Sequence, residues 1–134
     1  MKRRIDVEGV SVSGAPFSSA IAVDGRTLIH TSGFLARDPK SGAIVHPGDV
    51  ERQTLHCFDS IDRVLQAAGG ALQDIVKMTV FLRNVSDYDA MNRARRSRLA
   101  GIDYASSTVI AGLVAADALV EIECVAAVSG KAVP

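Results

Sequence analysis

Apolar residues that recur at intervals of three and four predict a helix between Asp49 and the Gly69-Gly70 pair. Aspartate is a preferred residue at helix N-termini, and Glu51 falls in the first turn, where the helix dipole favours acidic side chains. The two glycines end the pattern. The apolar positions form one stripe that we expect to be buried: Leu55, Phe58, Ile61, Leu65 and Ala68.

A β-hairpin is predicted near the N-terminus by the dipeptide Asp24-Gly25, which is typical of tight turns between antiparallel strands. It separates the segments 18–23, "SSAIAV", and 27–33, "TLIHTSG", and both are rich in strand-forming residues. We therefore expect these two segments to pair with each other.

The second half of the chain predicts three strands and one more helix. The segment "DIVKMTVFLRNV" has high β-propensity, and Asp87 can cap a helix that places Tyr88, Met91 and Leu99 on one side. The small residues Ala115-Ala116-Asp117 predict a turn before the last strand. The expected ranges are 74–85 for the first strand, 87–100 for the helix, and 107–113 and 118–128 for the other two strands.

The resulting order, β-β-β-α-β-α-β-β, predicts an α+β fold in which two helices cover one face of a sheet. A chain of 134 residues is one domain, residues 1–134, and is too short for two ordinary ones. The second sheet face is also rather apolar and has no predicted cover. Self-association would cover it, which favours an oligomer.

Composition and charge exclude several classes of partner. Hydrophobic residues make up 48% of the chain, and 15 basic side chains balance 15 acidic ones, so no overall field attracts nucleic acid or an anionic membrane. No apolar run of about 18 residues predicts a membrane span. The start, "MKRRIDVEG", lacks the apolar core of a signal peptide, and we expect a cytoplasmic protein.

Cysteine and histidine spacing gives no indication of a metal site. Cys57 and Cys124 lie in apolar periodic segments without a CxxC pair, so we expect two reduced cysteines in the core. His30, His46 and His56 lie far apart in the sequence, and we expect structural or surface roles for them.

The run "NRARRSR", residues 92–98, could in principle contact RNA phosphates. Its four arginines would extend most of the way around a helix, however, and form no flat patch. We expect a solvated or subunit-facing helix surface.

Glu121 and Glu123 are two residues apart on the last strand and therefore share one face. Residues 120, 122, 124 and 126 then face the core. The two acids belong either to an exposed sheet face or to the wall of a cleft in which one of them acts as a base. The pattern alone favours neither interpretation.

Five segments in order from Ala15 to Val128 resemble the Rid family, the reactive-intermediate deaminases, also called YjgF or endoribonuclease L-PSP proteins. The resemblance implies a chorismate-mutase-like α+β fold, a homotrimer with a small-molecule cleft at each subunit interface, and no cofactor or metal. The segments are "APFSSAI", "HTSGFLARDPKSGAIV", "QTLHCFDSIDRVLQAAGG", "DIVKMTVFLRNVSDYDAMN" and "VEIECVAAV".

One departure from the family concerns the cation of the cleft. The deaminating members carry a Pro-Ala-Arg-Ser segment whose arginine clamps the carboxylate of a 2-imino or 2-enamino acid. The matching residues here are Tyr104 to Ser107, so Ser106 stands where the arginine is expected and Tyr104 where the proline is expected. The segment from Asn92 to Ser106 is also about three residues shorter than in the family, and Arg95 replaces an aromatic residue of its helix.

The other family positions are partly retained. The resemblance assigns to Glu121 the catalytic role of positioning a water, and to Ser32-Gly33 the presentation of polar backbone to the ligand. Phe17 replaces a cleft tyrosine and Thr108 a frequent cysteine. The expected substrate-binding residues are Phe17, Ser32, Gly33, Asn92, Ser106 and Thr108.

Three functions are consistent with this pattern. The first is hydrolysis of a small imine or enamine with altered specificity, either on a substrate that depends less on a clamp or with another arginine, such as Arg37 or one of residues 93–98, as the clamp. The second is a trimer that binds a small ligand without catalysis. The third, action on RNA, is disfavoured by the neutral chain and by the arginines being spread around a helix.

Overall fold

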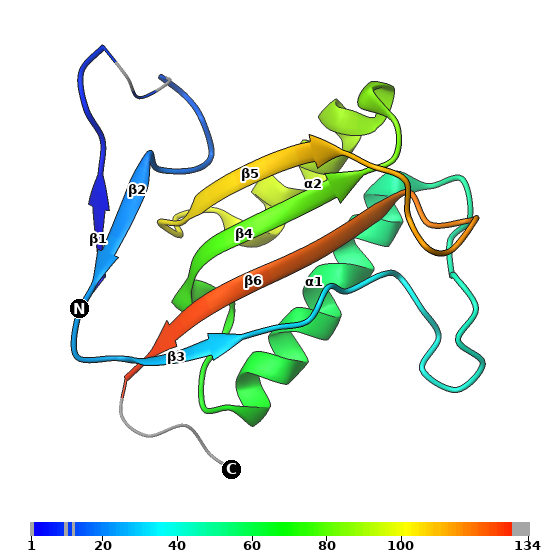
Figure 1. Ribbon diagram of the computed structural model, residues 1–134, viewed down its shortest axis with the longest axis horizontal. Coiled ribbons are helices and arrows are strands. Elements are labelled where there is room, and N and C mark those ends of the chain that lie inside the picture. Colours follow the sequence, from blue (N-terminus) through cyan, green and yellow to red (C-terminus); the bar gives the residue numbers. More distant parts are fainter. Residues whose placement is uncertain (1, 10, 12, 130–134) are drawn as a thin grey trace.

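The structure is a computed structural model that describes residues 2–9, 11 and 13–129, and it has the predicted order of elements (Figure 1). Short 3-10 turns, Leu72–Asp74 and Val85–Asp87, precede the fourth strand and the second helix. The helices are α1 (Val50–Ala67) and α2 (Tyr88–Leu99), and the strands are β1 (Lys2–Ile5), β2 (Ala20–Val23), β3 (Thr27–His30), β4 (Ile75–Leu82), β5 (Ala105–Ile110) and β6 (Val120–Val128).

The main sheet has four strands in the order β3-β6-β4-β5. β4 and β5 are parallel because α2 crosses over between them, and the other pairs are antiparallel. Both helices lie behind the sheet in Figure 1, so they cover the same face. The predicted α+β class, with two helices on one sheet face, is therefore confirmed.

Helix α1 begins and ends where the sequence predicts. A side-chain oxygen of Asp49 accepts a hydrogen bond from the backbone N–H of Arg52 at 3.0 Å, and Gly69 beyond the last turn has a φ of 85°. Phe58, Ile61 and Leu65 of the predicted stripe are completely buried. The 3.6-residue period therefore identified the face that packs on the sheet.

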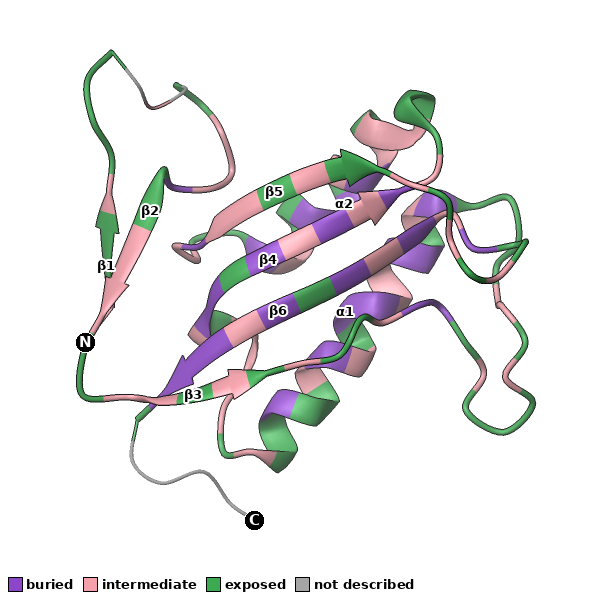
Figure 2. Ribbon diagram, viewed as in Figure 1, coloured by how far each residue is buried: buried purple, intermediate pink, exposed green. Residues whose placement is uncertain are grey.

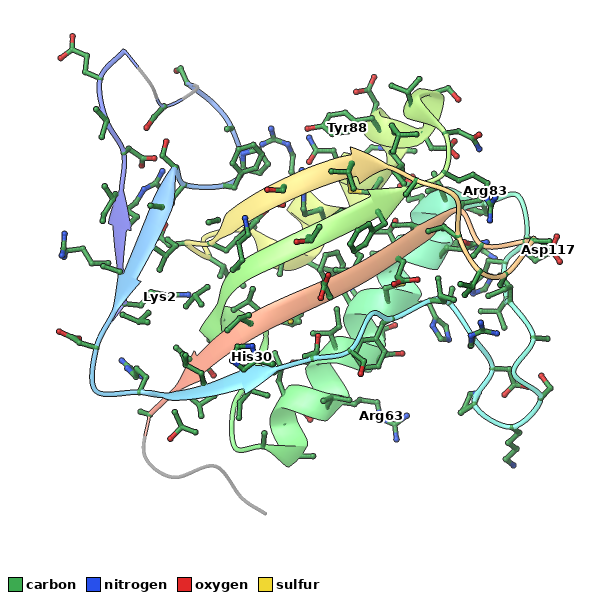
Figure 3. All side chains as sticks on the ribbon, in the orientation of Figure 1. Lys2, His30, Arg63, Arg83, Tyr88 and Asp117 are labelled. Carbon is green, nitrogen blue, oxygen red and sulfur yellow. The ribbon has the colours of Figure 1, made fainter. Side chains whose placement is uncertain are left out.

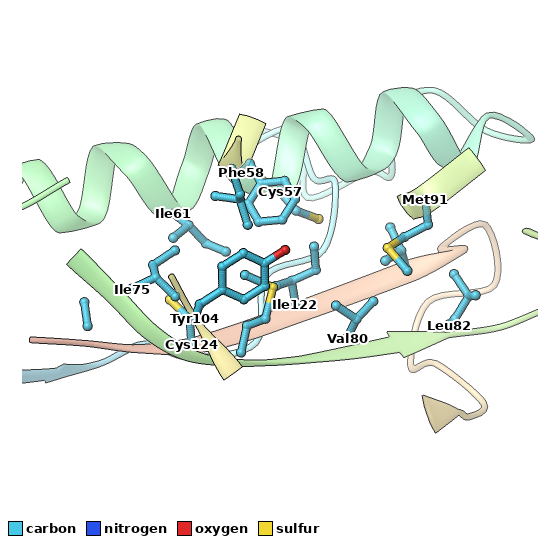
Figure 4. Close-up of a cluster of buried hydrophobic side chains, with 14 of the residues drawn as sticks. Cys57, Phe58, Ile61, Ile75, Val80, Leu82, Met91, Tyr104, Ile122 and Cys124 are labelled. Carbon is cyan, nitrogen blue, oxygen red and sulfur yellow. The ribbon is translucent and has the colours of Figure 1, made fainter. Parts of the chain in front are cut away.

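The core lies between the two helices and the sheet (Figure 4). β6 contributes alternate residues to it, and the predicted inward positions 120, 122, 124 and 126 are all buried. Cys57 and Cys124 are buried free cysteines, as expected. The thiol of Cys57 donates a hydrogen bond to the carbonyl of Phe34 at 3.2 Å, so its one polar group is satisfied.

The predicted pairing of segments 18–23 and 27–33 is wrong. The turn forms, with Gly25 at a φ of 59°, but β2 pairs with β1 in a separate two-stranded sheet, and β3 pairs with β6. A turn dipeptide fixes only the direction of the chain. β3 extends the main sheet by pairing with its longest strand, so the described strands form two sheets instead of one. A bridge between Ser18 and Ala105 connects the segment before β2 to β5.

The turn between β5 and β6 is held by Arg83, just beyond β4. Its guanidinium donates to the carbonyls of Ala118 at 2.7 Å and Ala115 at 2.8 Å. Figure 3 shows Arg83 and Asp117 at the same end of the molecule. This clamp fixes where β6 begins and therefore which of its residues face the helices.

The second face of the main sheet is covered by no described element and faces the viewer in Figure 2. Phe81 lies at its centre, opposite Val109 on one side and Glu121 on the other. Lys77 and Ser107 are joined on this face by a hydrogen bond of 3.2 Å.

In the described part of the chain, no helix combines the length and apolarity needed to cross a bilayer.

Candidate functional site

A buried guanidinium lies between α2 and β5, on the helix side of the sheet. The Nε and one terminal nitrogen of Arg95 donate to the side-chain carbonyl of Asn92 at 3.0 and 2.8 Å, and the other terminal nitrogen donates to Ser106 Oγ at 3.0 Å. The guanidinium carbon lies 5.6 Å from the centre of the Phe17 ring. We call these four residues, Phe17, Asn92, Arg95 and Ser106, the Arg95 cluster.

Arg95 differs from the neighbouring arginines of α2. Arg93 and Arg98 pair with Glu51 and Asp59 on the surface, whereas the Arg95 side chain is 0% exposed. Among the described residues, Arg95 has no carboxylate within ion-pair distance. The expectation that the whole run 92–98 is a solvated or subunit-facing surface is therefore wrong for Arg95.

The helical period explains why Arg95 is buried. It lies four residues after Met91 and four before Leu99, and both of these residues are in the core. The same spacing was available in the sequence, where Tyr88, Met91 and Leu99 were predicted to lie on one side of the helix. The sequence interpretation placed Arg95 on the surface because it is charged, although its spacing from Met91 and Leu99 places it on the buried side.

Thr108 extends the same face of β5. Ser106 is paired with Met78 and Thr108 with Val80, and both partners on β4 are completely buried. Since paired residues share a sheet face, the two hydroxyls lie on the helix side. The Arg95 cluster therefore brings together Phe17, Asn92 and Ser106 of the predicted binding residues, and Thr108 lies two residues further along the same face of β5.

A second polar group lies where β3 leaves its ladder with β6. Thr31 donates its backbone N–H to Cys124 at 2.9 Å, and Phe34 exchanges backbone bonds with Ile122 at 2.7 and 3.0 Å. Two residues, Ser32 and Gly33, thus oppose the single residue Glu123, which is a β-bulge. Within the described chain the backbone N–H groups of Ser32 and Gly33 have no partner.

The carboxylate of Glu121 lies directly over this bulge. A β-carbon added at Gly33 would be 2.3 Å from Glu121 Oε2 and 2.9 Å from its carboxyl carbon, so only glycine leaves room for the observed approach. No described residue donates a hydrogen bond to this carboxylate. Ser32, Gly33 and Glu121 form the Glu121 corner.

The negative charge of Glu121 affects the pKa of a thiol in the core. Burial, and in second place this negative charge, raise the pKa of the Cys57 thiol to about 12. A thiol with such a pKa stays protonated at neutral pH and is not a nucleophile. The reactive group of the corner is therefore the carboxylate.

The Arg95 cluster and the Glu121 corner do not meet within one copy of the chain. Glu121 is paired with Phe81, three residues along β4 from the partner of Ser106, and it lies on the uncovered sheet face. Two strand spacings and three residues along the strand correspond to about 14 Å between the α-carbons. A single copy thus holds the two predicted halves of the site on opposite faces of its sheet.

The three histidines add no further centre. His30 and His46 are exposed, and His56 is half-buried. The described residues contain no group of three or more His, Cys, Asp or Glu side chains that could hold a metal ion. The candidate chemistry is confined to a guanidinium and a carboxylate within an α+β domain.

Comparison with known proteins agrees with this fold. The model of the endoribonuclease L-PSP family matches residues 10–128. Among characterised proteins, the 3-aminoacrylate deaminase RutC of Acinetobacter baylyi is 36% identical over 119 residues, which cover 89% of this chain and 92% of the relative. The chain therefore belongs to the endoribonuclease L-PSP family, the Rid proteins.

Two solved structures show how far the likeness extends. The Rid-family protein YyfA of Yersinia pestis is 32% identical, with a TM-score of 0.68 over 96% of this chain and 100% of its own. The Rid-family protein YyfB of the same organism has a TM-score of 0.83 at 24% identity, over 95% of this chain and 98% of its own. The latter is a likeness of fold alone.

Proposed function

We propose that this protein is a deaminase that hydrolyses a small imine or enamine in a cleft between copies of a homotrimer. Family membership and the likeness to a 3-aminoacrylate deaminase support the class of reaction. The separation of the two halves of the site supports a cleft between copies, because the uncovered face of one copy can bring its Glu121 corner to another copy. The substrate is a small metabolite, without a cofactor.

The observation that carries the proposal is the Glu121 carboxylate over the open bulge. Hydrolysis of an imine adds water to the C=N carbon and ends with a carbonyl and ammonia. Glu121 accepts a proton from the attacking water and passes it to the nitrogen, which gives a carbinolamine. It then takes the proton of the new hydroxyl and passes it to the nitrogen, so the carbonyl forms as the carbon–nitrogen bond breaks and ammonia leaves. An enamine first becomes the imine by gaining a proton on carbon and losing one from nitrogen.

The backbone of the bulge has a role in the same step. Among the described residues the N–H groups of Ser32 and Gly33 have no partner, and they lie beside the carboxylate, where they can hold the oxygen of the water or of the substrate. Phe17, Asn92, Ser106 and Thr108 of another copy would form the opposite wall and bind the rest of the substrate. Glu121 is thus the catalytic residue.

Ammonia release from freshly generated 2-iminobutyrate, 2-aminoacrylate and 3-aminoacrylate tests the proposal. We expect turnover by the wild type and a loss of roughly a hundredfold or more in Glu121→Gln, which keeps the shape but cannot accept the proton. Glu123→Gln, on the same strand and face, is the matched control and should retain activity. Binding of the 2-keto acids without any ammonia release would instead support a ligand-binding trimer.

A further inference from the structure

The Arg95 guanidinium is a buried positive charge that lacks a counter-charge in the described chain. Burying an unpaired ion is strongly unfavourable, and a neutral amide, a hydroxyl and a ring offset only part of that cost. Arg93 and Arg98 of the same helix, in contrast, each pair with a carboxylate at the surface. An anion is therefore the group that the environment of Arg95 lacks.

The donors of Arg95 show where an anion could bind. A guanidinium has five N–H donors, of which Asn92 accepts two and Ser106 one. Asn92 occupies the edge formed by Nε and one terminal nitrogen. Among the described residues two N–H donors then have no partner, one on each terminal nitrogen. When Ser106 accepts the hydrogen that points towards Cδ, this pair is the fork that binds a carboxylate with two parallel hydrogen bonds.

We propose that Arg95 is the group that binds the substrate carboxylate, from helix α2, and that it determines specificity for small 2-imino or 2-enamino acids. The identity of the substrate rests on the proposed deaminase function, but the anion site itself does not. Asn92 orients the guanidinium from one edge. The hydroxyl of Ser106, which accepts from Arg95, donates its own proton to the carboxylate.

Phe17 controls access to the anion site. Its ring lies over the guanidinium, and the segment around it is held to the sheet where the backbone N–H of Ser18 donates to the carbonyl of Tyr104 at 2.7 Å. Asn92, Ser106 and Phe17 are each half-buried, although Arg95 is fully enclosed. Because Phe17 belongs neither to α2 nor to β5, we infer that its side chain can rotate away and open the guanidinium to a ligand.

Binding of non-reacting ligands tests the proposal without requiring turnover. Titration calorimetry compares 2-ketobutyrate with its neutral amide, 2-oxobutanamide, on the wild type, Arg95→Met, Arg95→Lys and Arg93→Met. We expect the wild type to bind the acid more tightly than the amide by roughly ten- to a hundredfold, the range for hydrogen bonds to a charged group.

The variants separate a binding role from a structural one. Arg95→Met should weaken binding of the acid by the same factor and leave binding of the amide nearly unchanged. Arg95→Lys should fall between, because a lysine keeps the charge but has no fork. Arg93→Met removes a surface arginine from the same helix and should bind like the wild type.

Two results would overturn the proposal. One is a wild type that binds acid and amide equally, or neither, and this result is decisive even where Arg95→Met fails to fold. The other is an equal loss of both ligands in Arg95→Met, which would indicate a structural cation. Acid-selective binding without ammonia release would retain the anion site and reject the deaminase function, so the two failures are distinguishable.

Discussion

The Arg95 cluster and the Glu121 corner are built in opposite ways. In the cluster, a helix, a strand and the segment before β2 surround a guanidinium that is 0% exposed and has three hydrogen bonds. In the corner, a carboxylate lies on the open sheet face beside two backbone N–H groups, and the described residues supply neither a donor for the carboxylate nor an acceptor for the N–H groups. One copy thus encloses the cation without giving it a carboxylate, and it leaves the acid on an open face. The corner is the half that requires a second copy.

The largest expected effect comes from mixing two impaired variants, Glu121→Gln and Arg95→Met. Each lacks one half of the site and, at substrate concentrations below KM, should be at least about tenfold less active than the wild type. When the two are refolded together, a cleft that takes Glu121 from one copy and Arg95 from the next should be intact at about a quarter of the interfaces, which restores that share of wild-type ammonia release.

Light scattering on the same samples provides the control. The wild type and both variants should have the mass of three chains at micromolar concentration. A mixture that is no more active than its components, with trimers present, would mean that both halves act within one copy. A monomer mass for the wild type would reject the homotrimer.

A smaller effect is expected from Gly33→Ala, which changes only the corner. The new methyl group would overlap the Glu121 carboxylate, the end of a flexible side chain that can swing aside. Displacement of the carboxylate by about 1 Å can lower the turnover rate by up to a hundredfold, whereas the free energy of unfolding should change by less than about 1 kcal/mol.

The matched control for Gly33→Ala is Gly112→Ala, because a methyl group at Gly112 meets nothing within 4 Å. Gly112→Ala should be as active and as stable as the wild type. Acid-selective binding by the Arg95 cluster should also survive in Gly33→Ala. If Gly33→Ala retains full turnover, the position of the carboxylate over the bulge is not important for the reaction.

Local sequence patterns predicted the helices and strands of this fold, but they did not predict which strands pair with each other. Alternation along β6 located the buried residues 120, 122, 124 and 126, and the cap at Asp49 located the start of α1. The dipeptide Asp24-Gly25 predicted its turn correctly but not the partner of either strand, because pairing depends on which other strand edge is available.

The residues of the candidate site could be named from the sequence, but their arrangement in space could not be predicted. The sequence identified Glu121 and Ser106 by resemblance, and it named the arginines of 93–98 as alternative clamps. Which of these arginines points inward follows from the spacing of Met91, Arg95 and Leu99, but a charged residue is seldom fully buried. The bulge at Ser32-Gly33 arises from a register difference between two distant strands, which no local pattern encodes.

The smallest expected effect tests the helix side, where Tyr104 is completely buried next to the start of β5. Its hydroxyl has no hydrogen-bond partner among the described residues, and in Figure 4 it points into the hydrophobic cluster. An unsatisfied buried hydroxyl costs about 1–3 kcal/mol. Tyr104→Phe should therefore raise the free energy of unfolding by about 1 kcal/mol, measured by urea denaturation at pH 7.

The same substitution should have a larger effect in alkali. Burial raises the pKa of the Tyr104 phenol above its ordinary value of 10.0, so the folded protein holds this proton where the unfolded chain has lost it. The unfolded state then binds fewer protons than the folded state, and the stability of the wild type falls as the pH rises above about 10. Phenylalanine has no proton to lose, so the free energy of unfolding of Tyr104→Phe should exceed that of the wild type by more at pH 11 than at pH 9.

A stability difference that does not change with pH would mean that the phenol ionises equally in both states. A lower stability of the variant at pH 7 would mean that the hydroxyl has a partner. Either result would show that the helix side of the sheet is more polar than its packing indicates. The difference in polarity between the helix side and the Glu121 corner would then be smaller.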